Sequence, residues 1–139
     1  MERLRLAGFA VAGITAALVL TGAQRPAALG GVAPGLWEIT GLPGMKAPAR
    51  ECLTDMTILA RYEHRSRTCA IKLISDGPSS VVFDYSCGGG GFGHTKIDVI
   101  TPRSLRIETQ GVADSLPFSD VLQARRVGDC PATASAARH

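Results

Sequence analysis

Hydrophobic and polar residues alternate most clearly between Cys69 and Cys87, where the chain reads CAIKLISDGPSSVVFDYSC. The turn-forming run Asp76-Gly-Pro-Ser-Ser80 divides this stretch into two arms. When the arms are paired so that residue numbers sum to 156, apolar partners meet on one face and Lys72 meets Asp84 on the other. A slip of one residue would turn each apolar set to the wrong face. The pattern therefore predicts an antiparallel hairpin with Cys69 opposite Cys87, Ile71 opposite Tyr85, Leu73 opposite Phe83, Ser75 opposite Val81, Ala70 opposite Ser86 and Ile74 opposite Val82.

A second hairpin is predicted over residues 95–109, with partners whose numbers sum to 204. This register pairs apolar residues on one face and residues of opposite charge on the other, as stable cross-strand pairs require. The implied loop Thr101-Pro-Arg103 lacks the glycine that a three-residue turn prefers, so the pattern favours a wider tip. The predicted pairs are Ile97 with Ile107, Val99 with Leu105, Thr95 with Thr109, Lys96 with Glu108 and Asp98 with Arg106.

Shorter patterns complete the predicted order of elements. Residues 35–40 alternate as a first strand with Trp37 and Ile39 on one side, and a short second strand ends near Cys52. Helical spacing predicts a helix over about 55–64, with Thr54 as its cap. A last strand covers about 118–127, where the inward face is ambiguous because Val121 and Leu122 are both apolar. The sequence thus predicts a mainly β domain: an antiparallel meander sheet, curled or forming a partial barrel, over one short helix.

The N-terminal segment has the pattern of a secretory signal peptide over residues 1–23. A basic start precedes the uncharged run Leu6–Leu20, and Thr21-Gly-Ala23 supplies the small residues of a cleavage site. The apolar run is short for a membrane span, which needs about 20 residues; an uncleaved anchor is the alternative. Residues 24–34 are expected to be a flexible leader, 35–130 the folded domain and 131–139 a disordered tail. We therefore expect a periplasmic or secreted protein.

Four cysteines in an exported chain predict two structural disulfides. The hairpin register selects Cys69–Cys87, which leaves Cys52–Cys130 as the second pair. Because the spacings contain no C-x-x-C, a redox-active dithiol is not expected. Zinc binding would need thiolates that the two disulfides consume.

A glycine-rich run resembles nucleotide-binding motifs but lies in the wrong context. Gly88, Gly90 and Gly93 fit G-x-G-x-x-G, and His94 stands close to where a P-loop needs lysine. Either site needs a helix at the last glycine to hold phosphate, whereas residues 95–109 alternate as strands. The run is therefore interpreted as a connection or bulge, and no cofactor is predicted.

Catalytic patterns are weak. A site built from His64 and His94 with Asp55 or Asp98 would require these residues to converge in space, and solvated or turn positions are the preferred interpretation. No serine lies in G-x-S-x-G. The carboxylates of Asp114 and Asp120, which flank a short apolar run, are interpreted as solvated loop charges. We therefore predict no catalytic residue, no metal site and no enzyme activity.

Two basic clusters are the candidate contact surfaces. Arg61, Arg65 and Arg67, with His64, follow the predicted helix, and Arg125-Arg126 form the second cluster. They suit anionic envelope polymers or phospholipid headgroups, although a solvated face is the simpler interpretation. The formal net charge of +3 is too small to indicate an acidic partner. Stacked aromatics for single-stranded nucleic acid are absent from the sequence, so no nucleic-acid partner is expected.

Several short motifs resemble a known family. Pro34-Gly-Leu-Trp-Glu38 at the mature start, Glu51-Cys-Leu-Thr54 before a helix, a cysteine in each middle strand and Gly128-Asp-Cys130 at the end are similar to the exported bacterial domain-of-unknown-function family 3617. The likeness covers roughly residues 33–130. It implies a periplasmic or secreted location, and it carries over no catalytic residue because the family has no assigned activity.

Three functions remain open on sequence alone. The first is a non-catalytic binding or envelope accessory module stabilised by disulfides. The second is a carrier of small apolar ligands or lipids in a cavity of the curled sheet. The third is a hydrolase, which would require an ionisable pair converging in a cleft.

Overall fold

The computed structural model describes residues 25–132. The predicted signal peptide and residues 133–139 of the predicted tail lie outside the described residues. The described chain contains two 3-10 helices and seven strands: η1 (Ala27–Leu29), β1 (Gly35–Thr40), β2 (Ala49–Leu53), η2 (Met56–His64), β3 (Cys69–Asp76), β4 (Ser80–Cys87), β5 (Phe92–Thr101), β6 (Ser104–Ala113) and β7 (Leu116–Gly128).

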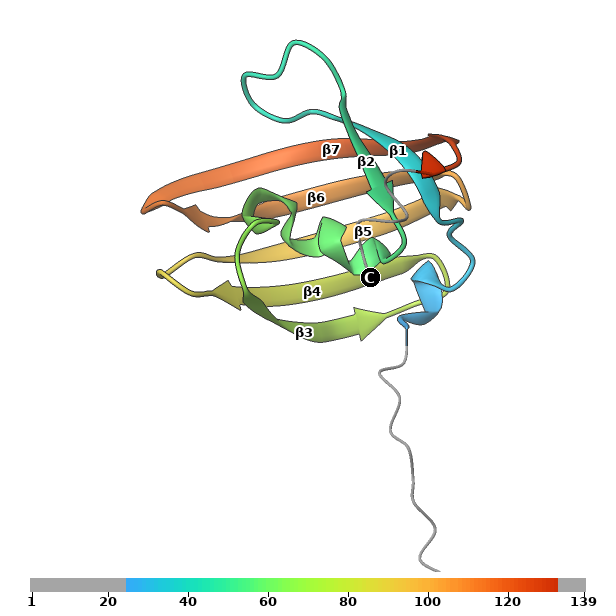
Figure 1. Ribbon diagram of the computed structural model, residues 1–139. Coiled ribbons are helices and arrows are strands. Elements are labelled where there is room, and N and C mark those ends of the chain that lie inside the picture. The colour runs from blue at the N-terminus through green and yellow to red at the C-terminus, as the bar shows by residue number, and fades with distance from the viewer. Residues whose placement is uncertain (1–24, 133–139) are drawn as a thin grey trace, which may run out of the picture.

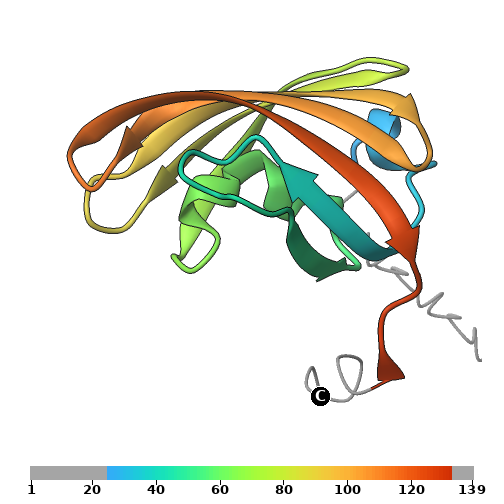
Figure 2. The same ribbon diagram turned by 90° about the horizontal axis from the view of Figure 1, so that it is seen from above.

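The strands form a single antiparallel sheet with the order β2-β1-β7-β6-β5-β4-β3 (Figure 1). Strands β3 to β7 follow one another as a meander, as the alternating patterns predicted. The β1-β2 hairpin is then added beside β7 through the pairing of β1 with β7. The sheet is curled but open, with β2 and β3 as its two edges, and η2 crosses one face (Figure 2). We call the face toward η2 the inner face and the opposite face the outer face.

The first predicted hairpin register is confirmed from the disulfide as far as Leu73 opposite Phe83. Beyond that point a bulge intervenes, so the predicted pairings of Ile74 with Val82 and of Ser75 with Val81 are wrong: Ser75 lies opposite Val82 and Asp76 opposite Val81. The extra residue in β3 turns Asp76 to the inner face. There its carboxylate accepts hydrogen bonds from the amides of Ala27 and Ala28 in η1, at 2.7 and 3.2 Å.

The second predicted register is confirmed for all five pairs between β5 and β6. The tip is narrower than expected, because a shift after Val99 pairs Thr101 directly with Ser104. The Thr101 hydroxyl accepts a hydrogen bond from the Arg103 amide at 3.1 Å, which supports the short turn without glycine.

The hydrophobic core lies between the inner face and the two 3-10 helices. Trp37 and Ile39 of β1 are fully buried, as their alternation predicted. On β7 the inward residues are Leu122 and Ala124, which resolves the ambiguity of that strand. Leu59, Ala60 and Tyr62 of η2 fill the space between this helix and the curled sheet. Large side chains thus occupy the region in which the carrier hypothesis expected a cavity.

The predicted helix is present, but as a 3-10 helix with a different cap. Asp55, rather than Thr54, is the N-cap residue, and its carboxylate accepts from the Thr57 amide at 2.9 Å. Non-helical backbone angles at Arg61 divide η2 into two turns. Leu59 and Tyr62, which are three residues apart, are both buried in the core.

The segment before β1 is packed rather than loose over its described part. Residues 24–34 were expected to be a flexible leader, whereas Ala28, Leu29 and Val32 are buried in the core. The indole of Trp37 donates to the Ala33 carbonyl at 3.2 Å. Apolar contacts and the Asp76 cap, neither of which local composition reveals, hold this segment in place.

Both predicted disulfides are present, Cys52–Cys130 and Cys69–Cys87, and among the described residues no cysteine is free. Such bonds are typical of proteins outside the reducing cytoplasm. Between residues 25 and 132, no helix has the length and apolar character needed to cross a membrane.

Candidate functional site

The outer face carries an open hollow of about 590 Å³ across β4, β5, β6 and β7. Its floor is the backbone of Gly93 and Gly111, which lie opposite each other on β5 and β6. The apolar wall includes Phe92, whose side chain is 53 % exposed. We call this feature the outer hollow; the side chains around its floor come from Asp84, Phe92, His94, Gln110, Val112 and Ser119.

A hydrogen-bonded histidine–aspartate pair lies at the rim of the outer hollow. His94 and Asp84 face each other on neighbouring strands, and the Nδ1–H of His94 donates to Asp84 Oδ1 at 2.6 Å. This hydrogen bond fixes the imidazole ring and assigns the Nδ1 proton. Both side chains are about half exposed. The hollow therefore combines an apolar wall with a positioned polar group, as ligand sites commonly do.

A second group of polar side chains is buried under η2. Glu63 of η2 and Asp120 of β7 approach each other, and Glu63 Oε1 and Asp120 Oδ2 are both buried without another hydrogen-bond donor among the described groups. Burial, followed by the nearby Asp120 charge, raises the pKa of Glu63. A proton shared by the two carboxyls would supply the missing donor. We call Glu63 and Asp120 the carboxyl pair.

The neighbours of the carboxyl pair form a row across the inner face. Thr95 and Thr109 are buried next to it, and their hydroxyls hydrogen-bond each other at 2.8 Å. In the adjoining row the ring of His64 packs against Tyr85, with ring centroids 5.3 Å apart. A Cβ at Gly93 would lie 2.4 Å from the Tyr85 hydroxyl. Glycine is therefore required there so that the tyrosine ring can lie flat on the sheet.

Sequence reasoning missed the carboxyl pair because it placed Asp120 in a solvated loop. Asp120 instead lies on β7, on the same face as Leu122 and Ala124. The i, i+2 spacing of these three residues was the available signal. Glu63 lies on η2, far from Asp120 in the sequence, and no local pattern pairs the two residues. The other half of the prediction, Asp114, is an exposed turn residue that forms an ion pair with Arg67.

The two tyrosines of the chain are expected to titrate late. Burial, then the hydrogen bond that the Tyr62 hydroxyl donates to Glu51, raises the pKa of Tyr62 to about 12. Burial also raises the pKa of Tyr85, against the effect of the Thr109 hydroxyl. A titration followed by the ultraviolet absorbance of tyrosinate should thus show no tyrosine of the folded protein ionising at the ordinary pKa of about 10. A step at the ordinary value would contradict the burial of one of the rings.

A family model matches the chain over residues 32–130, which include β1 to β7 and both disulfides. Its description is a protein of unknown function, DUF3617. The chain belongs to the DUF3617 family. This confirms the resemblance carried by the Pro34–Glu38 and Gly128–Cys130 motifs. No curated protein and no solved structure matches the chain.

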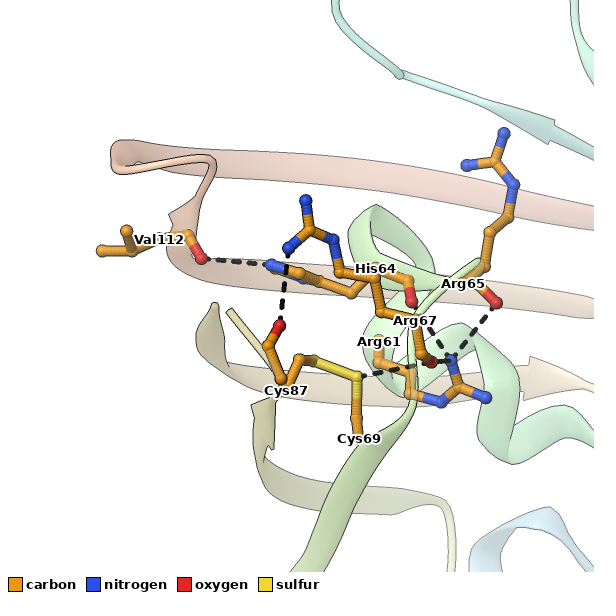
Figure 3. Close-up of a disulfide and its surroundings, with 8 residues drawn as sticks. Arg61, His64, Arg65, Arg67, Cys69, Cys87 and Val112 are labelled. Atoms are coloured by element: carbon orange, nitrogen blue, oxygen red, sulfur yellow. Dashed lines mark hydrogen bonds between the residues drawn. A yellow bond between two sulfur atoms is a disulfide. The ribbon is translucent and has the colours of Figure 1, made fainter. Parts of the chain in front are cut away.

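In this DUF3617 domain, the first basic cluster is engaged within the fold (Figure 3). The Arg61 guanidinium donates hydrogen bonds to the backbone carbonyls of His64, Arg65 and Arg67. These bonds hold the chain in place at the C-terminal end of η2. Arg65 stacks over the Tyr62 ring at 4.6 Å and forms an ion pair with Glu51 at 3.6 Å. The predicted contact residues therefore hold the segment before β3 against the domain.

The two histidines of the DUF3617 domain lie on opposite faces of the sheet. His64 is buried on the inner face, where its Nε2–H donates to the Val112 carbonyl at 3.1 Å, and His94 lies on the outer face with Asp84. Within residues 25–132, no group of three or more His, Cys, Asp or Glu residues has the arrangement of a metal site. The glycine run forms the β4–β5 turn, with positive φ at Gly89 and Gly90, and a strand rather than a helix follows it.

Proposed function

We propose that this DUF3617 protein is exported to the periplasm or the medium and acts there as a non-catalytic binding module. The outer hollow is the binding site, and its ligand is a small molecule with an apolar body and a polar group. Its volume of about 590 Å³ is the observation that carries this proposal. Ligand pockets are commonly about 300–1,000 Å³, with apolar walls and few polar groups.

Three further observations support this location. The space under η2 is occupied by Leu59 and Tyr62, so the inner face offers less room than the outer face. Arg61, Arg65 and Arg67, the predicted envelope contacts, form hydrogen bonds and ion pairs within the domain. Phe92 is an exposed aromatic ring in the wall of the outer hollow, where a ligand would bury it.

The binding site can be tested with anilinonaphthalene sulfonate, a fluorescent probe that combines an apolar body with an acidic group. Phe92→Ala should weaken probe binding about fivefold to tenfold, because about 1 kcal/mol of apolar burial is lost. Ile100→Ala removes another exposed apolar side chain, 62 % exposed and outside the hollow, and should leave the affinity unchanged. Equal losses in both variants, or no binding to the wild type, would contradict the proposal.

Hydrolysis is the second candidate, and the His94–Asp84 pair in the outer hollow favours it. A carboxylate that orients an imidazole is the arrangement of a general base. If the pair is catalytic, the wild type should turn over a nitrophenyl ester and His94→Ala should abolish that turnover. For a binding module, the same substitution changes probe affinity only.

Export has its own test. Expression of the full chain in a Gram-negative host, followed by intact-mass measurement of the envelope fraction, should give a product that begins at Gln24 and contains both disulfides. An uncleaved product in the membrane fraction would indicate an anchor instead.

A further inference from the structure

We propose that β3 is an interface strand, and that its partner is a second copy of this chain. The two β3 strands pair antiparallel around a two-fold axis at Ile71, so the sheet continues from one copy into the other. This inference concerns the sheet edge and is independent of the outer hollow.

The two edges of the sheet differ in how they are protected. Edge strands expose unpaired backbone groups, and proteins usually shorten them or place charges and proline on them. β2 has five residues, follows Pro48 and carries Arg50 and Glu51. β3 has eight residues, of which seven are exposed, and Lys72 is the one charge before its last residue. The bulge after Leu73 protects the end of β3, whereas the run Cys69–Leu73 before the bulge is mostly apolar and carries a single charge.

The hydrogen bonds around the disulfide show which β3 groups face outward. The Cys87 amide donates to Gly91, away from β3, and the Gly88 amide donates to the Thr68 carbonyl. The pair Cys69–Cys87 is therefore a non-hydrogen-bonded pair of the ladder. By alternation, the amides and carbonyls of Cys69, Ile71 and Leu73 point to the open edge, whereas those of Ala70 and Lys72 bond to β4.

The side chains of the same residues form an apolar strip. Ile71 and Leu73 lie on the inner face opposite Tyr85 and Phe83, which are buried. Ile71 and Leu73 themselves remain 38 % and 46 % exposed. A strand added to this edge would bond to their backbone groups and place its own alternate side chains beside them, as β-augmentation does.

The pattern of outward groups and charges favours a second copy as the occupant. Cys69, Ile71 and Leu73 are spaced symmetrically about Ile71, so an axis there joins Ile71 to Ile71 of the other copy and Leu73 to its Cys69. Every outward backbone group then meets another outward group. The same axis places each Lys72 opposite Ala70 of the other copy. An axis one residue further along would face Lys72 with Lys72, which is destabilising.

The test combines sedimentation velocity with amide hydrogen exchange. The wild type should form a dimer, and the Ile71 and Leu73 amides should become protected as concentration rises. The Ala70 and Lys72 amides should be protected at every concentration, because they bond to β4. Leu73→Lys should raise the dissociation constant of the dimer about tenfold or more. Ile100→Lys introduces the same charge at another exposed apolar position and should leave the dimer intact.

The outcomes separate this proposal from its rivals. A wild type that stays monomeric over the accessible concentration range would overturn it. Protection of the Ile71 and Leu73 amides that does not depend on concentration would also overturn it, because a segment of the same chain would then occupy the edge. A dimer that persists in Leu73→Lys, shown to be folded by thermal unfolding, would place the interface elsewhere.

Discussion

Replacing Cys52 and Cys130 together with serine is expected to lower the free energy of unfolding by about 4 to 5 kcal/mol. The bond joins β2 to the segment after β7 across a sequence separation of 78 residues, and β1 lies between these two strands. In the chain-entropy model a long loop restricts the unfolded chain strongly, which is the origin of the large value. Small domains have net stabilities of only about 5–15 kcal/mol, so this variant should lose a large share of its stability.

The second disulfide provides the matched comparison. Cys69 and Cys87 are separated by 18 residues, and serine at both positions should cost about 3 kcal/mol. Urea unfolding followed by circular dichroism gives both values under the same conditions. A larger loss for Cys69/Cys87 than for Cys52/Cys130 would contradict the loop-length argument. It would indicate that the bond acts by holding Arg67 and the end of η2 in place.

The parts of the fold that follow from strict alternation could be predicted from the sequence. In the β5–β6 hairpin, and in the β3–β4 hairpin up to Leu73, the register is over-determined, because apolar pairs on one face and opposite charges on the other agree on the same alignment. The disulfide pairing followed directly from the first of these registers. Trp37 and Ile39 were likewise assigned to the core by alternation alone.

The rest depended on contacts between distant segments. The bulge in β3 arises where Asp76 turns inward to cap η1, and no local pattern around Leu73 signals it. The burial of Ala28, Leu29 and Val32 has the same origin. The carboxyl pair joins η2 to β7, two elements that are far apart in the sequence. The outer hollow exists because Gly93 and Gly111 become neighbours across two strands, which a linear motif search around Gly93 does not consider.

Glu63→Gln is expected to stabilise the domain at neutral pH by about 1–3 kcal/mol, the cost of a buried polar group without a matching partner. Burial and the adjacent Asp120 raise the pKa of Glu63 above its unfolded value. The protonated form is therefore favoured in the folded state. This contribution to stability is fully present below the unfolded pKa of about 4.3, and it is lost as pH rises through the raised folded pKa. A glutamine donates a hydrogen bond to Asp120 at every pH and removes the loss.

The measurement is the difference in free energy of unfolding between Glu63→Gln and the wild type as a function of pH. That difference should be near zero in acid and should grow as pH rises. Taking the difference cancels the contributions of groups whose effect on stability has the opposite pH dependence. Asp98 is one such group: burial acts to raise its pKa, but hydrogen bonds from Lys96 and Ser80 outweigh burial and lower it.

Glu38→Gln is the matched control for the carboxyl pair. Glu38 forms an exposed ion pair with Arg50 at 2.7 Å, and such pairs contribute at most about 1 kcal/mol. Its removal should not make the domain more stable as pH rises. If Glu63→Gln destabilises the domain at neutral pH, the wild-type carboxyl must be ionised and paired with a cation, for which Arg65 is the candidate because its charge acts to lower the pKa of Glu63. Glu63 would then stabilise the C-terminal end of η2 through its charge rather than through a proton shared with Asp120.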